Sequence, residues 1–364
     1  MPRLLRWLTG AILATIVGCG GGSTPSAAPQ PSASPASRAS EIAEGSAEPG
    51  SSDPSSAPAP LPTELVLGQT FGMFHDPRLE QVVLVNGATE AGPDRPTELW
   101  RWDGAAWELL DAAGPPARSF AAIGRDPERE VVVVHGGVGS GRTTFDETLE
   151  WDGRDWSVAT VPGPGPREGA GLAYDAEARR MVLFGGAIGA EQLPDTWAWD
   201  GRVWERIAEA GPRQRFVSLM TEDRSAEGIL LQGGHWVDGN EGDFLGDTWR
   251  WSDGSWIEVT DASGPGPRVN APGAWDDRLG GIVMFGGGTG LDAPMGADTW
   301  QWNGAWSEVS TATAPSPRNG HALAFDAKRG VLVLVGGIAR PGGSQQLDVW
   351  ELGPDGWKQV LPAA

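Results

Sequence analysis

Cysteine and tyrosine are nearly absent from this chain: its 364 residues include one of each, together with four histidines. The single cysteine, Cys19, excludes disulfides within the chain, so the core alone has to stabilise the folded state. A folded part of about 300 residues is large enough for that. Chemistry that needs two cysteines, or a cysteine beside several tyrosines, is excluded as well.

Positive charge is also scarce, with 27 lysines and arginines against 48 aspartates and glutamates, a net charge of −21. Up to residue 63 there are three arginines and four acidic residues, so about −20 belongs to the rest of the chain. A surface this acidic repels phosphate backbones, and we therefore expect no nucleic-acid partner. It suits solubility or a cationic partner.

The first 18 residues predict an export signal. Arg3 and Arg6 precede the apolar run Leu8–Val17, which is too short to span a bilayer comfortably. The run ends in Ile16-Val17-Gly18 before Cys19, which resembles a bacterial lipobox. The resemblance implies that Cys19 carries a lipid such as palmitate and becomes the mature N-terminus; the alternative is an ordinary signal peptide with an incidental cysteine.

Residue Gly20 follows the cysteine, which favours the outer membrane or cell surface and leaves the periplasmic face open as an address. Residues 19–63 comprise the lipidated cysteine and a Ser-, Ala- and Pro-rich stretch that has too little apolar surface to form a core. We expect it to be a disordered tether.

From residue 64 to residue 364 a pattern repeats about every 50 residues. Each copy ends a hydrophobic run with a glycine pair: Asn86-Gly87 (a degenerate first copy), Gly136-Gly137, Gly185-Gly186, Gly233-Gly234, Gly286-Gly287 and Gly336-Gly337. Eleven residues before each second glycine stands an aspartate: Asp76, Asp126, Asp175, Asp223, Asp276 and Asp326. This fixed spacing predicts a hairpin of two strands, and a unit of this size has to stack on its neighbours to bury its apolar face.

The second strand of each hairpin is continuously apolar, as expected for a strand buried on both faces. A third strand with a Trp-x-Trp alternation follows, then an Asp-Gly or Asn-Gly turn and a fourth strand that begins with Trp. Four antiparallel strands in six copies predict an all-β, six-bladed β-propeller. Its blades should cover about residues 68–112, 118–161, 167–210, 215–262, 268–312 and 318–361.

Sixteen of the nineteen tryptophans fall on this template. Leu149 and Leu352 replace a tryptophan in two copies, and replacement of an indole by an aliphatic side chain indicates packing between blades rather than a sugar site. Trp7, Trp236 and Trp275 lie off the template.

The glycine pair, the third strand opened by an acidic residue and the tryptophan one hairpin later resemble kelch repeats. Six copies in phase cover about residues 68–360, and the period exceeds that of WD-type propellers. The resemblance implies a propeller that most often binds proteins, with enzymes as a minority, so the fold alone does not decide activity.

Two enzyme classes of similar fold can be tested against the residues. The copper site of galactose-oxidase-type enzymes needs a cysteine joined to a tyrosine and a second tyrosine, which this chain lacks. Retaining sialidases use a tyrosine nucleophile, but Tyr174 lies in a repeating register beside Asp175, which predicts packing. The run Ser252–Trp256 also lacks the sialidase spacing. We assign no catalytic residue and no cofactor.

A second repeated set consists of arginines eight residues before the hairpin aspartates: Arg118, Arg167, Arg215, Arg268 and Arg318, with Gly68 in the first copy. They should surround the mouth of the central channel. An anion-binding ring of arginines would suit a small-molecule enzyme similar to sialic-acid mutarotases. The favoured alternative pairs each arginine with the acidic residue that opens a third strand: Glu98, Glu147, Asp195, Asp247, Asp298 or Asp348.

The four histidines, His75, His135, His235 and His321, occupy different registers, and no acidic or thiol partners cluster near them in sequence, so we assign no metal. The acidic run from Asp238 to Asp243 lacks the full spacing of a calcium loop and predicts a solvated turn.

The loop between the second and third strands is longest in the fourth copy, and its aromatic residues Trp236 and Phe244 are not demanded by the template. Together with His235 they are our candidate binding residues, unless they fold back over their own blade. The sequence therefore predicts a monomeric, lipid-anchored, non-catalytic propeller that binds a protein or glycan through this face. The alternative is the small-molecule enzyme with the arginine-ringed channel.

Overall fold

The computed structural model describes residues 65, 67, 72–87, 96–111, 113–139, 142–209, 211–239, 241–260, 262–290, 293–340 and 343–362. The predicted export signal, Cys19 and the tether to residue 63 lie outside the described residues. Within the described part there is no helix long and apolar enough to cross a membrane.

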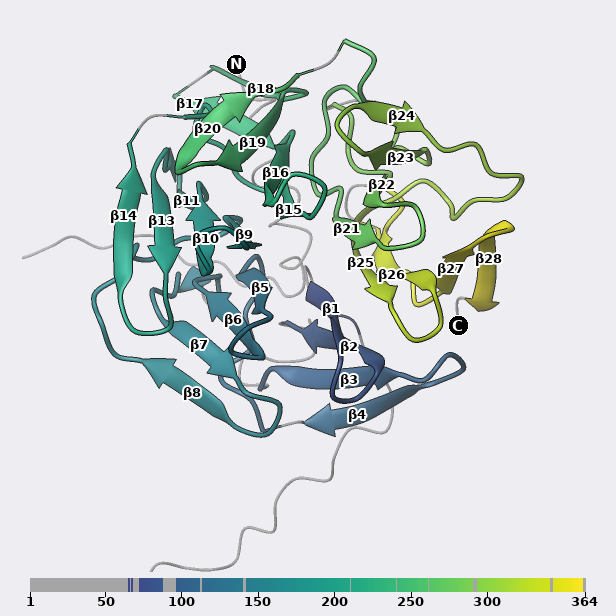
Figure 1. Cartoon of the computed structure of the whole chain (residues 1–364), viewed down its shortest axis with the longest axis horizontal. Helices are drawn as coiled ribbons and strands as arrows, with labels where there is room; N and C mark the ends of the chain where they lie inside the picture. The colour runs from purple at the N-terminus through teal and green to yellow at the C-terminus, as the bar shows by residue number, and fades with distance from the viewer. Residues whose placement is uncertain are drawn as a thin grey trace, which may run out of the picture. The chain divides into compact units, whose positions relative to one another are not determined.

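Six four-stranded antiparallel sheets stand side by side around a common centre (Figure 1). They confirm the predicted six-bladed β-propeller. The first three blades are formed by β1 (Gly72–Asp76), β2 (Gln81–Asn86), β3 (Glu98–Trp102) and β4 (Trp107–Asp111); β5 (Ala122–Asp126), β6 (Val131–His135), β7 (Thr148–Trp151) and β8 (Trp156–Ala159); and β9 (Gly171–Asp175), β10 (Arg180–Phe184), β13 (Thr196–Trp199) and β14 (Trp204–Ala208).

The last three blades repeat the same order of strands. They are formed by β15 (Leu219–Asp223), β16 (Gly228–Gln232), β19 (Thr248–Ser252) and β20 (Ser255–Glu258); β21 (Gly273–Asp276), β22 (Gly281–Phe285), β23 (Thr299–Trp302) and β24 (Trp306–Glu308); and β25 (Asn319–Asp326), β26 (Val331–Ile338), β27 (Val349–Gly353) and β28 (Gly356–Leu361). Two small hairpins extend the loops that follow β10 and β16: β11 (Ala187–Ile188) with β12 (Glu191–Gln192), and β17 (His235–Asp238) with β18 (Glu241–Phe244).

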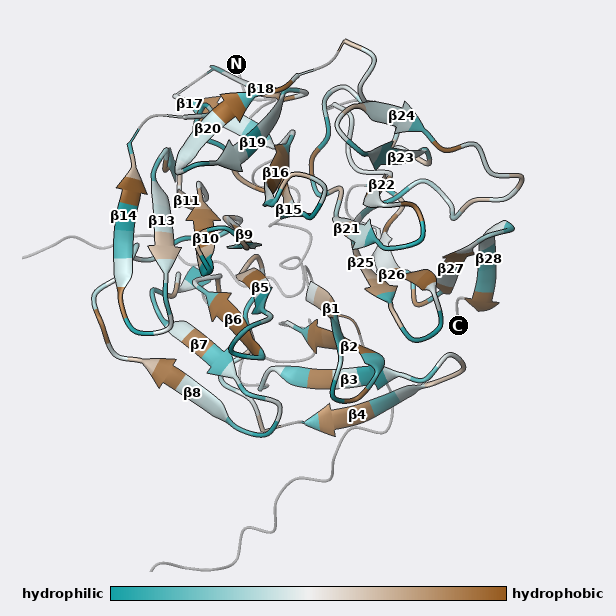
Figure 2. Cartoon of the chain, in the orientation of Figure 1, coloured by the Kyte–Doolittle hydropathy of each residue, from teal (hydrophilic) through white to brown (hydrophobic). Residues whose placement is uncertain are grey.

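The innermost strands of the six blades surround the centre, and the outermost strand of each blade pairs on one side only (Figure 1). The second strands are the apolar ones, and the brown segments of β2, β6, β10, β16 and β26 mark them in Figure 2. Their side chains on both faces are buried, because each blade is covered by a neighbour on either side.

The hydrophobic core is divided into six clusters of buried side chains, and each cluster lies between two adjacent blades. One side chain of the third strand enters the cluster shared with the preceding blade: Trp102, Trp151, Trp199, Trp251, Trp302 or Leu352. Burial of an indole removes about 150–250 Å² from water, worth about 4–6 kcal/mol at about 25 cal/mol per Å². The predicted packing of tryptophans between blades is confirmed.

Hydrogen bonds join four of these indoles to the preceding blade, two of them to the aspartate of its hairpin turn. Trp251 and Trp302 donate Nε1–H to Asp175 and Asp223, each at 2.9 Å. In another blade the hairpin aspartate, Asp126, accepts a hydrogen bond from Arg129 instead. The indole there donates to a glutamate, as Trp199 does to Glu150 at 2.6 Å. Each aspartate also accepts hydrogen bonds from backbone N–H groups of its own turn or from a turn arginine, so one carboxylate both shapes a hairpin and anchors the next blade.

The tryptophans that open the fourth strands form a second set of links. Four of them donate Nε1–H to a threonine hydroxyl of the preceding blade, and the donor and acceptor pairs are Trp204 with Thr148, Trp256 with Thr196, Trp306 with Thr248 and Trp357 with Thr299. These distances lie between 2.8 and 3.0 Å. Each threonine is the residue that follows the acidic opening of its third strand.

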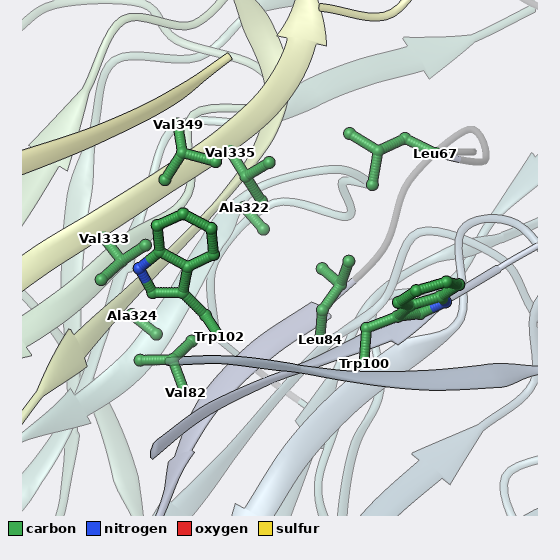
Figure 3. Close-up of a cluster of buried hydrophobic side chains, with 10 residues drawn as sticks. All are labelled: Leu67, Val82, Leu84, Trp100, Trp102, Ala322, Ala324, Val333, Val335 and Val349. Atoms are coloured by element: carbon green, nitrogen blue, oxygen red, sulfur yellow. The ribbon is translucent and has the colours of Figure 1, made fainter. Parts of the chain in front are cut away.

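The ring closes between the first and last blades without exchange of a strand, because each of these blades is built from four consecutive strands. Figure 3 shows the closing cluster, in which Trp102 of β3 lies among Val333, Val349 and Ala324 of the last blade. Leu67 is buried in the same cluster and belongs to no strand.

One hydrogen bond is missing at this closure. Val349 stands where four other blades have threonine, and the buried Nε1–H of Trp107 has no acceptor in the described part of the chain. An unpaired buried donor costs about 1–3 kcal/mol. The closure therefore lacks the bond from an indole to a threonine, although Trp102 Nε1–H still donates to Glu351 across it at 3.1 Å.

This contrast predicts opposite effects for two substitutions of similar shape. Thr299→Val removes the acceptor of Trp357 and should lower the free energy of unfolding by about 1–3 kcal/mol. Val349→Thr supplies an acceptor for Trp107 and should be neutral or stabilising, whereas the control Val333→Thr buries a hydroxyl away from any tryptophan of this set and should destabilise. Guanidinium denaturation of the three variants measures this, and equal losses in Val349→Thr and Val333→Thr would contradict it.

Candidate functional site

The five repeated arginines lie at the glycine-pair end of the propeller, and their side chains are buried, between 0 and 10% exposed. Each forms an ion pair with the acidic residue that opens the third strand of its own blade. The pairs are Arg118 with Glu147, Arg167 with Asp195, Arg215 with Asp247, Arg268 with Asp298 and Arg318 with Asp348. The structural pairing favoured from the sequence is present.

The four aspartates of these pairs each accept a further hydrogen bond from a tryptophan two residues later, at 2.7 Å for Trp197 and Asp195, whereas Leu149 follows Glu147. Burial opposes ionisation of Asp195, but the hydrogen bonds from Arg167 and Trp197 outweigh it and hold the pKa of this carboxyl below its usual value. The pKa values of Asp247 and Asp348 are lowered against burial in the same way. The positive and negative charges of each pair therefore offset each other within the blade.

The same arginines also join neighbouring blades. Between the second and third blades, Gly137 N–H donates to the carbonyl of Arg167 at 2.8 Å. Nη1 of Arg167 in turn donates to the carbonyl of Gly185 in its own blade at 2.9 Å. The equivalent backbone bonds to Arg215, Arg268 and Arg318 measure 2.7–2.9 Å. Four of the arginines, all except Arg118, therefore hold their own third strand and the preceding blade at once.

A chain of backbone hydrogen bonds links the starts of successive innermost strands, two residues after each arginine. Gly169 N–H donates to the carbonyl of Phe120, Val217 to Gly169, Asn270 to Val217 and Gly320 to Asn270, at 2.7–3.0 Å. All five residues have φ between 50° and 66°. This conformation is unusual for a β-branched valine, and here the bonds between blades maintain it.

The loop of the fourth blade forms the hairpin of β17 and β18. The His235 ring packs edge-on against Phe244 and lies beside Phe216, with centroids 5.1 and 5.4 Å apart. Trp236 alternates to the other face of the hairpin, where the guanidinium of Arg213 stacks over it at 4.0 Å. Phe244 is buried, and Trp236 is half-buried.

The third blade braces this hairpin. The side-chain amide of Gln192 in β12 donates to the carbonyl of His235 at 3.2 Å and accepts from Val237 N–H at 2.9 Å. The amide thus completes the hydrogen bonds of one edge of β17. Because Gln192 is itself buried, the hairpin stands in a fixed position beside the third blade.

On its other side the hairpin borders a depression of about 190 Å³. It is lined by His235, Gly242, Asp243, Phe244, Pro267, Thr289 and Gly290. These residues come from the loops of the fourth and fifth blades and from the connection between them. His235 and Phe244 thus meet at one site, whereas the five arginines belong to the ion pairs described above and Trp236 points to the other face.

The histidine in this depression is uncharged at neutral pH. Burial lowers the pKa of His235 to about 4, although the nearby Asp243 carboxylate raises it. The side chain is 7% exposed, and its buried Nε2 has no hydrogen-bond partner among the described residues. An unpaired buried nitrogen at a cavity wall is a polar atom available to a ligand.

Two other features bear on chemistry. Tyr174 is buried, and burial raises the pKa of its hydroxyl to about 12, the opposite of what a nucleophile needs. In the described part of the chain, no three His, Cys, Asp or Glu side chains gather as metal ligands.

A search of family models and of curated proteins finds no match to this chain.

His235 and Phe244 are recognisable from the sequence as candidate binding residues, whereas Asp243, Pro267 and Thr289 are not. Asp243 was predicted in a solvated turn, and it lies instead in β18 opposite Trp236. Thr289 follows the glycine pair of another blade, so its place beside the hairpin depends on tertiary packing, which no local pattern in the sequence encodes.

Three buried histidines make the folded state sensitive to mild acid. Burial lowers the pKa values of His135 and His235 to about 4 and that of His321 well below its usual value. An unfolded histidine titrates near 6.5, so their contribution is complete above about pH 6.5 and is lost as the pH falls toward 4. For His135 and His235 the loss is about 3 kcal/mol each.

We expect the free energy of unfolding to fall between pH 6.5 and 4.5, above the range in which the paired aspartates titrate. His321→Leu removes one titrating group and should reduce the slope of stability against pH by about one proton, or ~1.4 kcal/mol per pH unit. The substitution breaks no hydrogen bond, because neither ring nitrogen of His321 has a partner among the described residues. Denaturant titrations across this pH range test it. A stability that stays constant from pH 7 to 4.5 would refute the prediction.

Proposed function

We propose that the chain is a kelch-type propeller, exported and held at the outer membrane or cell surface by a lipid on Cys19, that binds a protein or glycan partner without catalysis. The repeat pattern supports the kelch assignment, and the lipobox-like Ile16–Cys19 run and the tether support the anchor. The partner meets the face that carries the loops between second and third strands.

The fourth-blade hairpin is the observation that carries this proposal. Like the smaller β11–β12 hairpin it is not required by the template, yet it is braced by Gln192 and presents Trp236 beneath Arg213. Aromatic and arginine side chains fixed in this way are enriched at binding interfaces. A scaffold that only built the ring would have no need of them.

The alternative function, a small-molecule enzyme with an arginine-ringed channel, needs guanidinium groups that are free to hold an anionic substrate. The five arginines are buried against the protein's own carboxylates. No observation on the described residues favours this alternative over the scaffold.

The anchor is tested by Cys19→Ala. We expect the native chain to sediment with membranes and to incorporate labelled palmitate, and the variant to appear in the soluble exported fraction without label. Ser23→Ala serves as the control within the same segment. Membrane association of the Cys19→Ala chain equal to that of the native chain would remove the anchor from the proposal.

The binding face is tested by Trp236→Ala. Partners crosslinked to the anchored chain on intact cells should be lost or reduced at least tenfold in this variant. Trp275→Ala is the matched control, because Trp275 is also a half-buried, off-template tryptophan but lies beside Asp276 at the opposite end of its blade. Equal capture by the native and Trp236→Ala chains would show that the hairpin is not the binding surface.

A further inference from the structure

The depression beside the fourth-blade hairpin has the size and chemistry of a site for one side chain. Its volume is about 190 Å³. One wall is β18, with Phe244 and Asp243, and the opposite wall is Thr289 and Gly290 of the fifth blade. Pro267 completes the lining between the two blades.

The charged lining of this depression is of one sign. Asp243 is exposed and forms no ion pair with the basic residues that the structure describes. One of its oxygens accepts the N–H of Phe244 at 2.8 Å, and the other has no such partner. The lining includes no lysine or arginine, and the chain beyond residue 63 carries a net charge of about −20.

The uncharged polar lining fits the same kind of ligand. His235 is neutral at pH 7, so one of its ring nitrogens is a hydrogen-bond acceptor. The adjacent Phe244 ring supplies a π face, which attracts a cation within about 6 Å of its centroid. A carboxylate, an imidazole acceptor and an aromatic ring together form a pocket for a cation that also donates hydrogen bonds.

We propose that this depression receives a lysine or arginine side chain of the partner protein, an inference that rests on the proposed binding function. An anionic group would meet Asp243 without any compensating cation. A purely apolar side chain would cover the Asp243 carboxylate without a partner, at a cost of at least about 1–3 kcal/mol, and would leave His235 Nε2 unpaired as it already is. A cationic side chain satisfies both, and the acidic surface draws it in.

The test uses the purified full chain and five-residue peptides Ac-Gly-Gly-X-Gly-Gly-amide at 0.15 M salt. The central residue X is lysine, arginine, norleucine or glutamate, and binding is followed by the imidazole ¹H–¹⁵N signals of His235, assigned with His235→Gln. The lysine or arginine peptide should shift these signals in a saturable way. The norleucine and glutamate peptides should not.

Asp243→Asn should weaken binding of the cationic peptide at least tenfold. The matched control is Asp238→Asn, which removes the same charge from an exposed position of the same hairpin outside the depression, and it should change binding less than twofold. Equal losses in the two variants would overturn the site in favour of non-specific attraction. Saturable binding of the norleucine peptide, or displacement of the lysine peptide by methyl pyranosides, would overturn the cationic ligand.

These outcomes are separate from those of the proposed function. The peptide experiment needs neither the membrane anchor nor an identified partner, so its failure leaves capture through Trp236 unaffected. If capture fails while the cationic peptides still bind at Asp243, the depression stands and the wider binding face does not.

Discussion

The propeller depends on one type of contact, which recurs between neighbouring blades: the glycine pair of one blade meets the arginine of the next. The second glycine donates to the arginine carbonyl, and the arginine side chain turns back to a glycine carbonyl and a carboxylate of its own blade. The first glycine has φ of about 70°, and a Cβ on Gly185 would lie 2.6 Å from the Arg215 carbonyl. Only glycine fits, which explains why the pair recurs at every such junction. Loss of an arginine would leave a buried carboxylate unpaired, a change that typically costs about 3–5 kcal/mol.

The parts of the fold that the repeat encodes could be predicted because the information is local and occurs six times. The spacing from Asp175 to Gly186 defines a hairpin, and the exchange of tryptophan for Leu352 at one register identifies a packing position. The fourth-blade hairpin has no equivalent in the other copies, so the repeat could not predict the pairing of His235 with Phe244. Its contact with Thr289 depends on tertiary packing alone.

The first blade departs furthest from the repeat, and its neighbours show the physical effects. Trp107 and Trp151, which pack across its two junctions, have buried indole N–H groups without partners in the described chain. Val349 replaces a threonine on one side, and on the other Arg101 stands where Glu150 and Glu351 accept indole hydrogen bonds elsewhere. The closing junction keeps the apolar contact shown in Figure 3 and the bond from Trp102 to Glu351, but it lacks the bond from an indole to a threonine that four other junctions have.

The outermost strands give the acidic composition a role that does not involve a partner. Each of the six blades ends in a strand whose outer row of backbone N–H and C=O groups faces solvent, and such a row is a template for pairing with another copy of the chain. Exposed Glu108, Glu205, Glu258 and Glu308 lie on four of these strands. Glu108 and Glu205 are paired with Arg101 and Arg180, so Glu258 and Glu308 are the ones that would bring like charges together when two copies approach edge to edge, which opposes such pairing.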